Sequence, residues 1–129
     1  MVAQEAWGGY NSLLNRLIGH YVSRNFHCCI PREADVEGVY FCHHGFGIVI
    51  NSSAKIGRGT IIQHCVTIGE VDGNAPIIGD NCYIGARAIV IGNIRIGNNV
   101  KIGAGAVVCK DVPDNCTVVG NPARIINKK

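Results

Sequence analysis

Three histidines of this chain have the type and spacing that acid–base chemistry requires. His43 and His44 are adjacent, a glycine-rich stretch with Gly45 and Gly47 follows them, and His64 comes later. A neutral imidazole has an unperturbed pKa of about 6.5, so it accepts a proton from a hydroxyl at physiological pH. The pattern is therefore consistent with a general base. Hydrogen-bonded histidines at a surface or a subunit interface fit the same spacing, so both interpretations stay open at this point.

Cysteines next to these histidines offer a second chemistry. The clusters are His27-Cys28-Cys29, Cys42-His43-His44 and His64-Cys65. Thiolate and imidazole groups are zinc ligands, so a zinc-binding protein is an alternative to an enzyme that uses the histidines as bases. The chain has no Cys-x-x-Cys spacing, and we expect no metal. Its seven cysteines also predict no disulfides, because their number is odd and a cytosolic setting keeps thiols reduced.

The elements that must position these side chains follow from an apolar residue that returns at every sixth position. The series is Ile50, Ile56, Ile62, Ile68, Ile78, Ile84, Val90, Ile96, Ile102 and Val108. A period of six fits neither an α-helix nor a flat strand, and it is typical of a hexapeptide repeat. Three hexapeptides form one triangular coil, and coils stack as parallel strands about 4.8 Å apart. The prediction is an all-β solenoid, a parallel β-helix with an Ile and Val core.

Small residues mark the corners of the predicted coils. We call the members of the six-residue series ruler residues. A glycine directly follows a ruler residue at six positions, Gly57, Gly69, Gly79, Gly85, Gly97 and Gly103. We expect these glycines to adopt backbone angles that a Cβ would strain. A second series lies two residues before the next ruler position, and it comprises Thr60, Val66, Cys82, Ala88, Ile94, Val100 and Ala106.

The chain divides into an N-terminal helical cap segment, 1–28, and a β-helix domain, 29–126. Leu and Ile at spacings of three and four predict a short helix within 4–25, which would cover the open end of the solenoid. The first coil keeps the six-residue step at Ile30, Val36 and Cys42, and two extra residues then interrupt it at 43–47. A second interruption is the loop 70–75. Because residues one coil apart stack, the first interruption and His64 should share one neighbourhood, and interruptions of a repeat often carry function.

Several motifs of this chain are similar to those of one enzyme family. They are Cys29-Ile-Pro31, the run from His43 to Asn51, the run from Gln63 to Gly69, Cys109 to Pro113, and Val118 to Ile125. Over about residues 29 to 126 the chain resembles the serine acetyltransferase branch of the hexapeptide acyltransferases. The resemblance implies left-handed winding of the coils. It also implies an acetyl-CoA-dependent O-acetyltransferase that acts on a hydroxyl of a small acceptor, an amino acid or a sugar.

The resemblance assigns roles around the first interruption. The family's catalytic histidine lies three residues before the glycine of a Gly-Ile-Val run, which here points to His44 and Gly47, with His43 as the near competitor. The implied reaction is direct transfer without an acyl-enzyme. His64 and Phe46 are the expected substrate-binding residues, although Phe46 has the alternative of only anchoring the interruption.

The same resemblance predicts how acetyl-CoA binds. Backbone groups at Ala86 and Ala104 would hold the pantetheine arm, and Lys110 and Arg124 would face the nucleotide phosphates. These cations fit a solvated surface equally well, and small residues are expected at any corner of a β-helix. In the family the groove lies between neighbouring subunits. A prism only a few coils tall also buries a narrow core, so we expect a homotrimer.

One departure from the family pattern concerns the base. Serine acetyltransferases carry an acidic residue fifteen positions before the catalytic histidine, where this chain has Cys29. Glu33 and Asp35 are the nearby carboxylates that remain as substitutes. The 70–75 loop is shorter than in the family and lacks its second histidine, and the segment before the repeat is short for the family's N-terminal helical domain. The acceptor therefore stays open, and a catalytically impaired protein with a binding or assembly role is an alternative.

Composition limits the remaining classes of function. The 129 residues suit one domain, and the net charge of +3 is spread out rather than clustered. With few aromatic residues and no basic cluster beyond the two final lysines, we expect no nucleic-acid partner. No signal peptide or long apolar run is visible, so we expect a cytoplasmic protein without membrane contact.

Overall fold

The computed structural model describes residues 2–3, 24 and 27–128. The helix predicted within 4–25, and with it most of the proposed cap segment 1–28, lies outside the described residues. The remainder is a stack of coils built from short parallel strands, which confirms the predicted all-β solenoid.

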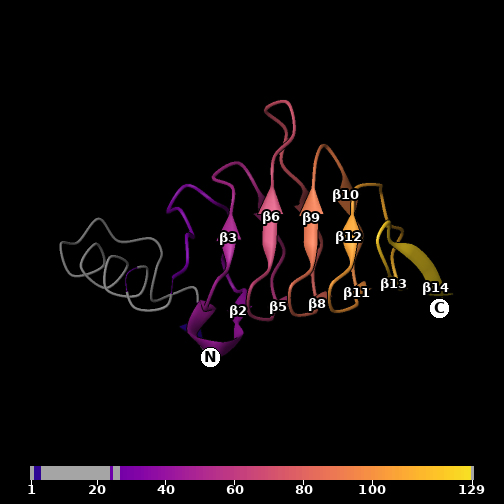
Figure 1. Cartoon of the computed structure of the whole chain (residues 1–129), viewed down its shortest axis with the longest axis horizontal. Coiled ribbons are helices and arrows are strands. Elements are labelled where there is room, and N and C mark those ends of the chain that lie inside the picture. The colour runs from indigo at the N-terminus through magenta and orange to yellow at the C-terminus, as the bar shows by residue number, and fades with distance from the viewer. Residues whose placement is uncertain (1, 4–23, 25–26, 129) are drawn as a thin grey trace.

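Three sheets form the sides of the stack, which we name A, B and C. Sheet A contains β1 (Val2–Ala3), β2 (Tyr40–Phe41), β5 (Ile61–Ile62), β8 (Tyr83–Ile84), β11 (Lys101–Ile102), β13 (Cys116–Val119) and β14 (Arg124–Lys128). Sheet B contains β3 (Val49–Ile50), β6 (Thr67–Gly69), β9 (Ile89–Ile91) and β12 (Val107–Val108). Sheet C contains β4 (Lys55–Ile56), β7 (Ile77–Ile78) and β10 (Arg95–Ile96). Figure 1 shows the four strands of sheet B side by side along the stack.

Neighbouring strands pair in parallel except at the two ends of sheet A. There β1 pairs antiparallel with β2, and β14 pairs antiparallel with β13. Along the regular part of the stack, partners are eighteen residues apart, as Ile89 and Val107 are. Partners across the 70–75 loop are twenty-two apart, as Thr67 and Ile89 are. The loop therefore adds four residues to its coil, and Figure 1 shows it projecting from the stack after β6.

The core consists of the residues that the six-residue period predicts. All ten members of the series from Ile50 to Val108 are at most 4% exposed. The second series, which lies two residues before each ruler position, is buried as well, and it includes Thr60 as the buried polar residue of the described core. The hydroxyl of Thr60 donates to the carbonyl of Gly79 (3.0 Å) and accepts from the N–H of Cys82 (3.1 Å). Both hydrogen bonds join successive coils, so this polar group stabilises the stack.

The register of the first coil differs from the prediction at one step. Phe41, and not Cys42, is the fully buried residue of β2, where it pairs with Ile62. Tyr40 and Ile61 are twenty-one residues apart, whereas Val49 and Thr67 are eighteen apart, so the interruption adds three residues between β2 and β3. The larger Phe side chain takes the core position because it buries more apolar area than the thiol of Cys42.

The glycines that follow ruler residues are required for a different reason from the predicted one. Gly57 and Gly85 do not have a positive φ, so strain at that angle does not select them. A Cβ on Gly57 would lie 2.5 Å from the carbonyl carbon of Gly79, and one on Gly85 would lie 2.6 Å from the nitrogen of Ala104. These corners therefore need glycine because the next coil passes too close for a side chain.

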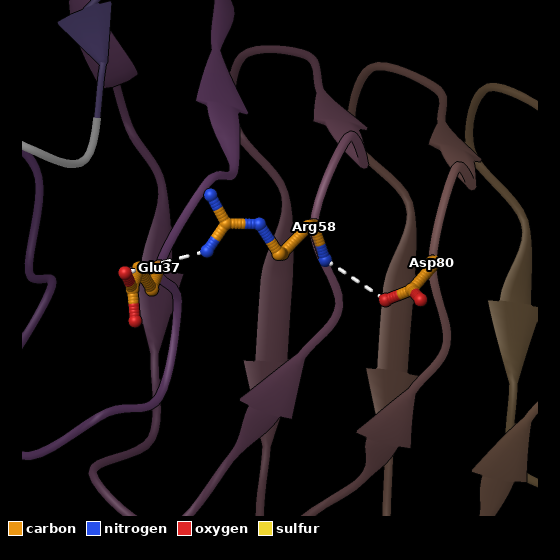
Figure 2. A network of polar contacts seen from close by, with 3 residues as sticks. All are labelled: Glu37, Arg58 and Asp80. Atoms are coloured by element: carbon orange, nitrogen blue, oxygen red, sulfur yellow. Dashed lines mark hydrogen bonds and ion pairs between the residues drawn. The ribbon is translucent and has the colours of Figure 1, made fainter.

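A ladder of side-chain hydrogen bonds follows the corner where sheet C leads into sheet A. Each backbone N–H donates to a carboxylate or amide oxygen in the next coil, from Arg58 to Asp80 (2.9 Å), from Asp80 to Asn98 (2.8 Å) and from Asn98 to Asp114 (2.7 Å). The guanidinium of Arg58 also lies 3.3 Å from the Glu37 carboxylate one coil earlier, as Figure 2 shows. This ion pair is exposed and contributes little to stability, whereas the ladder gives hydrogen-bond acceptors to backbone amides that strand pairing leaves without one.

In the described part of the chain, no helix is long and apolar enough to span a membrane.

Candidate functional site

The interruption between β2 and β3 folds into a tight turn, η2 (Cys42–Gly45), that presents two histidines. His43, His44 and Gly45 all have left-handed backbone angles, with φ of 53°, 57° and 76°. Left-handed angles disfavour residues with a Cβ by about 1–2 kcal/mol each, so the surrounding structure must hold this turn. Two hydrogen bonds do so, from the Phe46 N–H to the His43 carbonyl and from the Ile48 N–H to the Gly45 carbonyl, each 3.1 Å.

An open pocket of about 440 Å³ is lined by His43, His44, Phe46 and His64. The rings of His43 and His64 are perpendicular, with centroids 4.9 Å apart. Phe46 is 43% exposed, and its ring also makes an edge contact with the ring of His27 at 5.9 Å. The structure thus brings together the four residues that the sequence proposed for catalysis and substrate binding. We call this cavity the histidine pocket.

Contact between two coils fixes the two sides of the histidine pocket. The Cys65 N–H donates to the Phe46 carbonyl (2.8 Å). Gly47 has a φ of 67°, and a Cβ there would lie 2.8 Å from the Cys65 sulfur. Gly47 is therefore needed both for its backbone angle and for its close approach to the turn that carries His64.

Residues predicted to bind acetyl-CoA continue the same corner of the prism, which joins sheet A to sheet B. Above the Phe46 and His64 turns, the Arg87 N–H donates to the His64 carbonyl (3.1 Å), and the Gly105 N–H donates to the Ala86 carbonyl (2.9 Å). Ala86 is half-buried and Ala104 is exposed. The corner therefore runs without a break from the histidine pocket to both alanines.

Arg87 is a residue of this corner that the sequence analysis did not single out. It is exposed and has a left-handed φ of 62°, at the position where the neighbouring coils have Cys65 and Gly105. The sequence signal that identifies it is a large cationic residue at a corner position where the other coils have small residues. Its guanidinium has no ion-pair partner within the described ranges.

Lys110 and Arg124 belong to the C-terminal end of the stack. Both line a second pocket of about 390 Å³, together with Cys109, Pro122 and Ile125 among other residues. Lys110 follows β12, so the width of sheet B separates it from the corner with Ala86 and Ala104. Arg124, by contrast, begins β14 in sheet A and pairs with Val119, which lies next to Gly103 in the following coil.

Cys29 and the two carboxylates considered as substitutes, Glu33 and Asp35, belong to the first coil. Cys29 is exposed and pairs with Val49 at the start of sheet B. Asp35 pairs with Lys55 on sheet C, and Glu33 is exposed in the turn before it. None of these three residues lines the histidine pocket.

None of the seven cysteines, all of which lie within the described residues, forms a disulfide. Cys28 is buried beneath the η2 turn, where its sulfur lies 3.9 Å from the Cβ position of Gly45. Burial raises the pKa of the Cys28 thiol, and the neighbouring Cys29 adds to this effect. Among the residues that the structure describes, no group of three or more His, Cys, Asp or Glu side chains is arranged to hold a metal ion. The clusters considered for zinc are therefore not gathered into a described site.

Comparison with known proteins gives one family match and many related chains. Residues 75–110 match the family described as bacterial transferase hexapeptide (six repeats). Serine acetyltransferase of Synechococcus elongatus is 47% identical over 90 residues, which make up 67% of this chain and 37% of that protein. Serine acetyltransferase 2 of Arabidopsis thaliana is 36% identical over 129 residues, which make up 97% of this chain and 40% of that protein.

Solved structures show the same similarity. The crystal structure of Neisseria gonorrhoeae serine acetyltransferase in complex with serine superposes with a TM-score of 0.77 at 42% identity, over 86% of this chain and 47% of that one. The chain thus spans less than half the length of each of these three relatives.

Proposed function

The chain belongs to the hexapeptide-repeat superfamily of left-handed β-helix acyltransferases, and on this premise we propose that it is an acetyl-CoA-dependent O-acetyltransferase. The acceptor is a hydroxyl of a small molecule, an amino acid or a sugar. The observation that carries the proposal is the histidine pocket, where two coils present three imidazoles at the corner that continues to Ala86 and Ala104.

In the proposed reaction His44 is the general base. Its imidazole removes the proton of the acceptor hydroxyl, and the oxygen attacks the carbonyl carbon of the acetyl thioester. The tetrahedral intermediate then breaks its carbon–sulfur bond, the CoA thiolate leaves, and the His44 imidazolium returns the proton to the sulfur. No acyl-enzyme forms. General-base assistance of this kind contributes about 10²- to 10⁴-fold to the rate.

His43 remains the competitor for the role of base. Both histidines belong to the left-handed η2 turn and line the same pocket. The position three residues before Gly47 favours His44, whereas the ring of His43 faces His64. We therefore assign His44 to proton transfer, and Phe46 and His64 to contacts with the acceptor or the acetyl group.

Acetyl-CoA binding is proposed to involve two copies of the chain. Ala86 and Ala104 lie at the corner between sheets A and B, whereas Lys110 lies at the far edge of sheet B, so a groove between two neighbouring copies would let Lys110 of one copy and the alanines of the other act on one acetyl-CoA. Arg124 and Lys110 would then pair with phosphate oxygens.

Sheet B supports such an assembly. Its outward-facing column consists of Cys29, Val49, Thr67, Ile89 and Val107. Over the described residues this column carries no charge, whereas the column of sheet C includes Lys55 and Arg95. An uncharged face suits burial against a second copy. We propose a homotrimer in which these faces are covered. Seven cysteines that form no disulfide also suit a reducing compartment, which supports a cytoplasmic location.

A second candidate function is a binding or assembly role without efficient catalysis. The observation that favours it is Cys29, which stands at the position where serine acetyltransferases carry an acidic residue.

Steady-state kinetics with acetyl-CoA separates the two candidates. The acceptor panel is serine, homoserine, neutral sugars and amino sugars, and release of free CoA thiol is measured. We expect transfer to at least one acceptor, a loss of about 10²- to 10⁴-fold in kcat for His44→Ala, and a smaller loss for His43→Ala. If both variants matched the wild-type protein, the assignment of the histidines would be wrong. If no acceptor were acetylated, the binding role would be favoured.

A further inference from the structure

The His64 side chain lines the histidine pocket, and one of its two ring nitrogens is buried. The buried atom is Nδ1, which has no hydrogen-bond partner within the described part of the chain. Most buried polar side-chain atoms in proteins have a partner, so an exception asks for an explanation. The rest of the ring contributes to the pocket wall together with His43, His44 and Phe46.

The burial of Nδ1 indicates where the ring carries its hydrogen. Any form with hydrogen on Nδ1 would leave a buried N–H without an acceptor, and orphaned buried N–H groups are rarer than orphaned acceptors. The neutral tautomer with hydrogen on Nε2 avoids this. In that tautomer His64 presents an N–H donor, and not a basic lone pair, to the pocket.

Contacts on two sides hold the donor in place. The ring of His43 lies perpendicular to the ring of His64 at 4.9 Å and restricts its rotation. The His64 carbonyl accepts the Arg87 N–H from the next coil (3.1 Å), and the following residue, Cys65, donates its N–H to Phe46 in the coil before (2.8 Å). A donor fixed before the reaction begins stabilises developing charge without reorganisation.

We propose that His64 is a catalytic hydrogen-bond donor whose Nε2–H binds the acetyl carbonyl oxygen as it becomes an oxyanion. This role rests on the proposed acetyl transfer. When His44 takes the hydroxyl proton and the carbon–oxygen bond forms, the carbonyl π electrons move to oxygen, and that oxygen accepts the His64 hydrogen bond. When the carbon–sulfur bond breaks, the charge leaves with the CoA thiolate, and His64 keeps its hydrogen throughout. The two histidines thus have different tasks, a base from the η2 turn and a donor from the next coil.

A matched pair of substitutions tests the atom that acts. The amide nitrogen of glutamine reaches about the position of a histidine Nε2, whereas that of asparagine reaches about the position of Nδ1. We expect His64→Gln to keep kcat within about tenfold of wild type. His64→Asn should lose about 10²- to 10³-fold in kcat, the usual effect of removing one oxyanion donor. The KM for acetyl-CoA and the acidic limb of the pH profile should stay unchanged in both variants, because the base is His44.

Nitrogen-15 NMR of the histidine side chains supplies a measurement that does not depend on turnover. Hydrogen on Nε2 of His64 in the wild-type protein is expected, and hydrogen on Nδ1 would overturn the proposal. Equal activity of the two folded variants, checked by thermal melts, would also overturn it while leaving acetyl transfer intact. If the wild-type protein acetylated no acceptor of the panel, the proposed function would fail and the catalytic role of His64 with it.

Discussion

At the scale of single residues, the site combines the imidazoles of the η2 turn with a cysteine, Cys29, at the position where the family carries an acidic residue. The η2 turn fixes the backbone of His43 and His44 through hydrogen bonds of its own. What an acidic partner would add is orientation of the ring and stabilisation of its charged form. Cys29, which pairs with Val49 at the edge of the first coil, is a poor substitute for this task.

The substitution Cys29→Asp tests this interpretation. If Cys29 occupies the position of the missing acid, an aspartate there should raise kcat by about tenfold, because it would stabilise the imidazolium that forms on His44. Cys29→Asn has nearly the same shape without the charge and should give no increase. Acetyl transfer by the two variants, measured at one pH, compares them directly. Equal rates for Asp and Asn would show that this position does not act on the base.

At the scale of elements, the corners decide which residues the coils tolerate. Gly57 lies against the backbone of Gly79, whereas Gly105 has a φ of 71° and open space around it. The same substitution therefore meets two different obstacles. At Gly57 a methyl group overlaps backbone that cannot move, and at Gly105 it meets only an unfavourable backbone angle.

Urea unfolding of Gly57→Ala and Gly105→Ala measures this difference. We expect Gly57→Ala to lower the free energy of unfolding by about 3 kcal/mol, as overpacking does at a rigid contact. Gly105→Ala should lower it by about 1 kcal/mol, the usual disadvantage of a left-handed alanine. A larger loss at Gly105 than at Gly57 would mean that backbone angle and not space selects the corner residues.

These elements also show what a sequence can and cannot predict here. The period of six identified the buried ruler residues, because only one face of such a repeat can be apolar. It misplaced Phe41 by one position, since Phe41 and Cys42 are both apolar and the interruption relaxes the register. The sequence does not show why residue 57 must be glycine, because the requirement depends on how closely the backbone of the next coil passes. Lys110 lies six residues after Ala104, which is one side of the prism, so family motifs alone do not show which residues share a corner.

At the scale of the whole molecule, the outward columns of the three sheets differ in charge, and this difference predicts the assembly. Ile89 lies in the uncharged column of sheet B, whereas Ile77, which is 37% exposed, lies between Lys55 and Arg95 on sheet C. Ile89→Lys should therefore convert a trimer into monomers and abolish acetyl transfer. Ile77→Lys is the matched control and should change neither. Sedimentation equilibrium reports the mass, and a monomeric wild-type protein would contradict the proposed assembly.

Global stability should also respond to alkaline pH through Cys82. Burial raises the pKa of this thiol above its ordinary value of 9.0, although hydrogen bonds to Val100, Thr60 and Asn99 oppose the effect. The folded protein thus holds this proton more tightly than the unfolded chain does. The contribution to stability is fully present below pH 9 and declines as the pH rises above it.

Unfolding curves at pH 7 and pH 10 for the wild-type protein and for Cys82→Ala isolate this effect. The wild-type protein should lose more stability between the two values than the variant does, because only the wild type carries the thiol. Equal losses would show that Cys82 does not contribute. The exposed thiol of Cys109 provides a check, since it should react with a thiol reagent in the folded protein while Cys82 stays protected.

The ladder from Arg58 through Asp80 and Asn98 to Asp114 has a direction that bears on how the protein is made. In every step the backbone N–H belongs to the earlier coil and the accepting oxygen to the later one. During synthesis, the backbone N–H of a coil that has left the ribosome therefore has no ladder acceptor until the next coil has also emerged. Folding of this domain should advance toward the C-terminus about one coil behind translation.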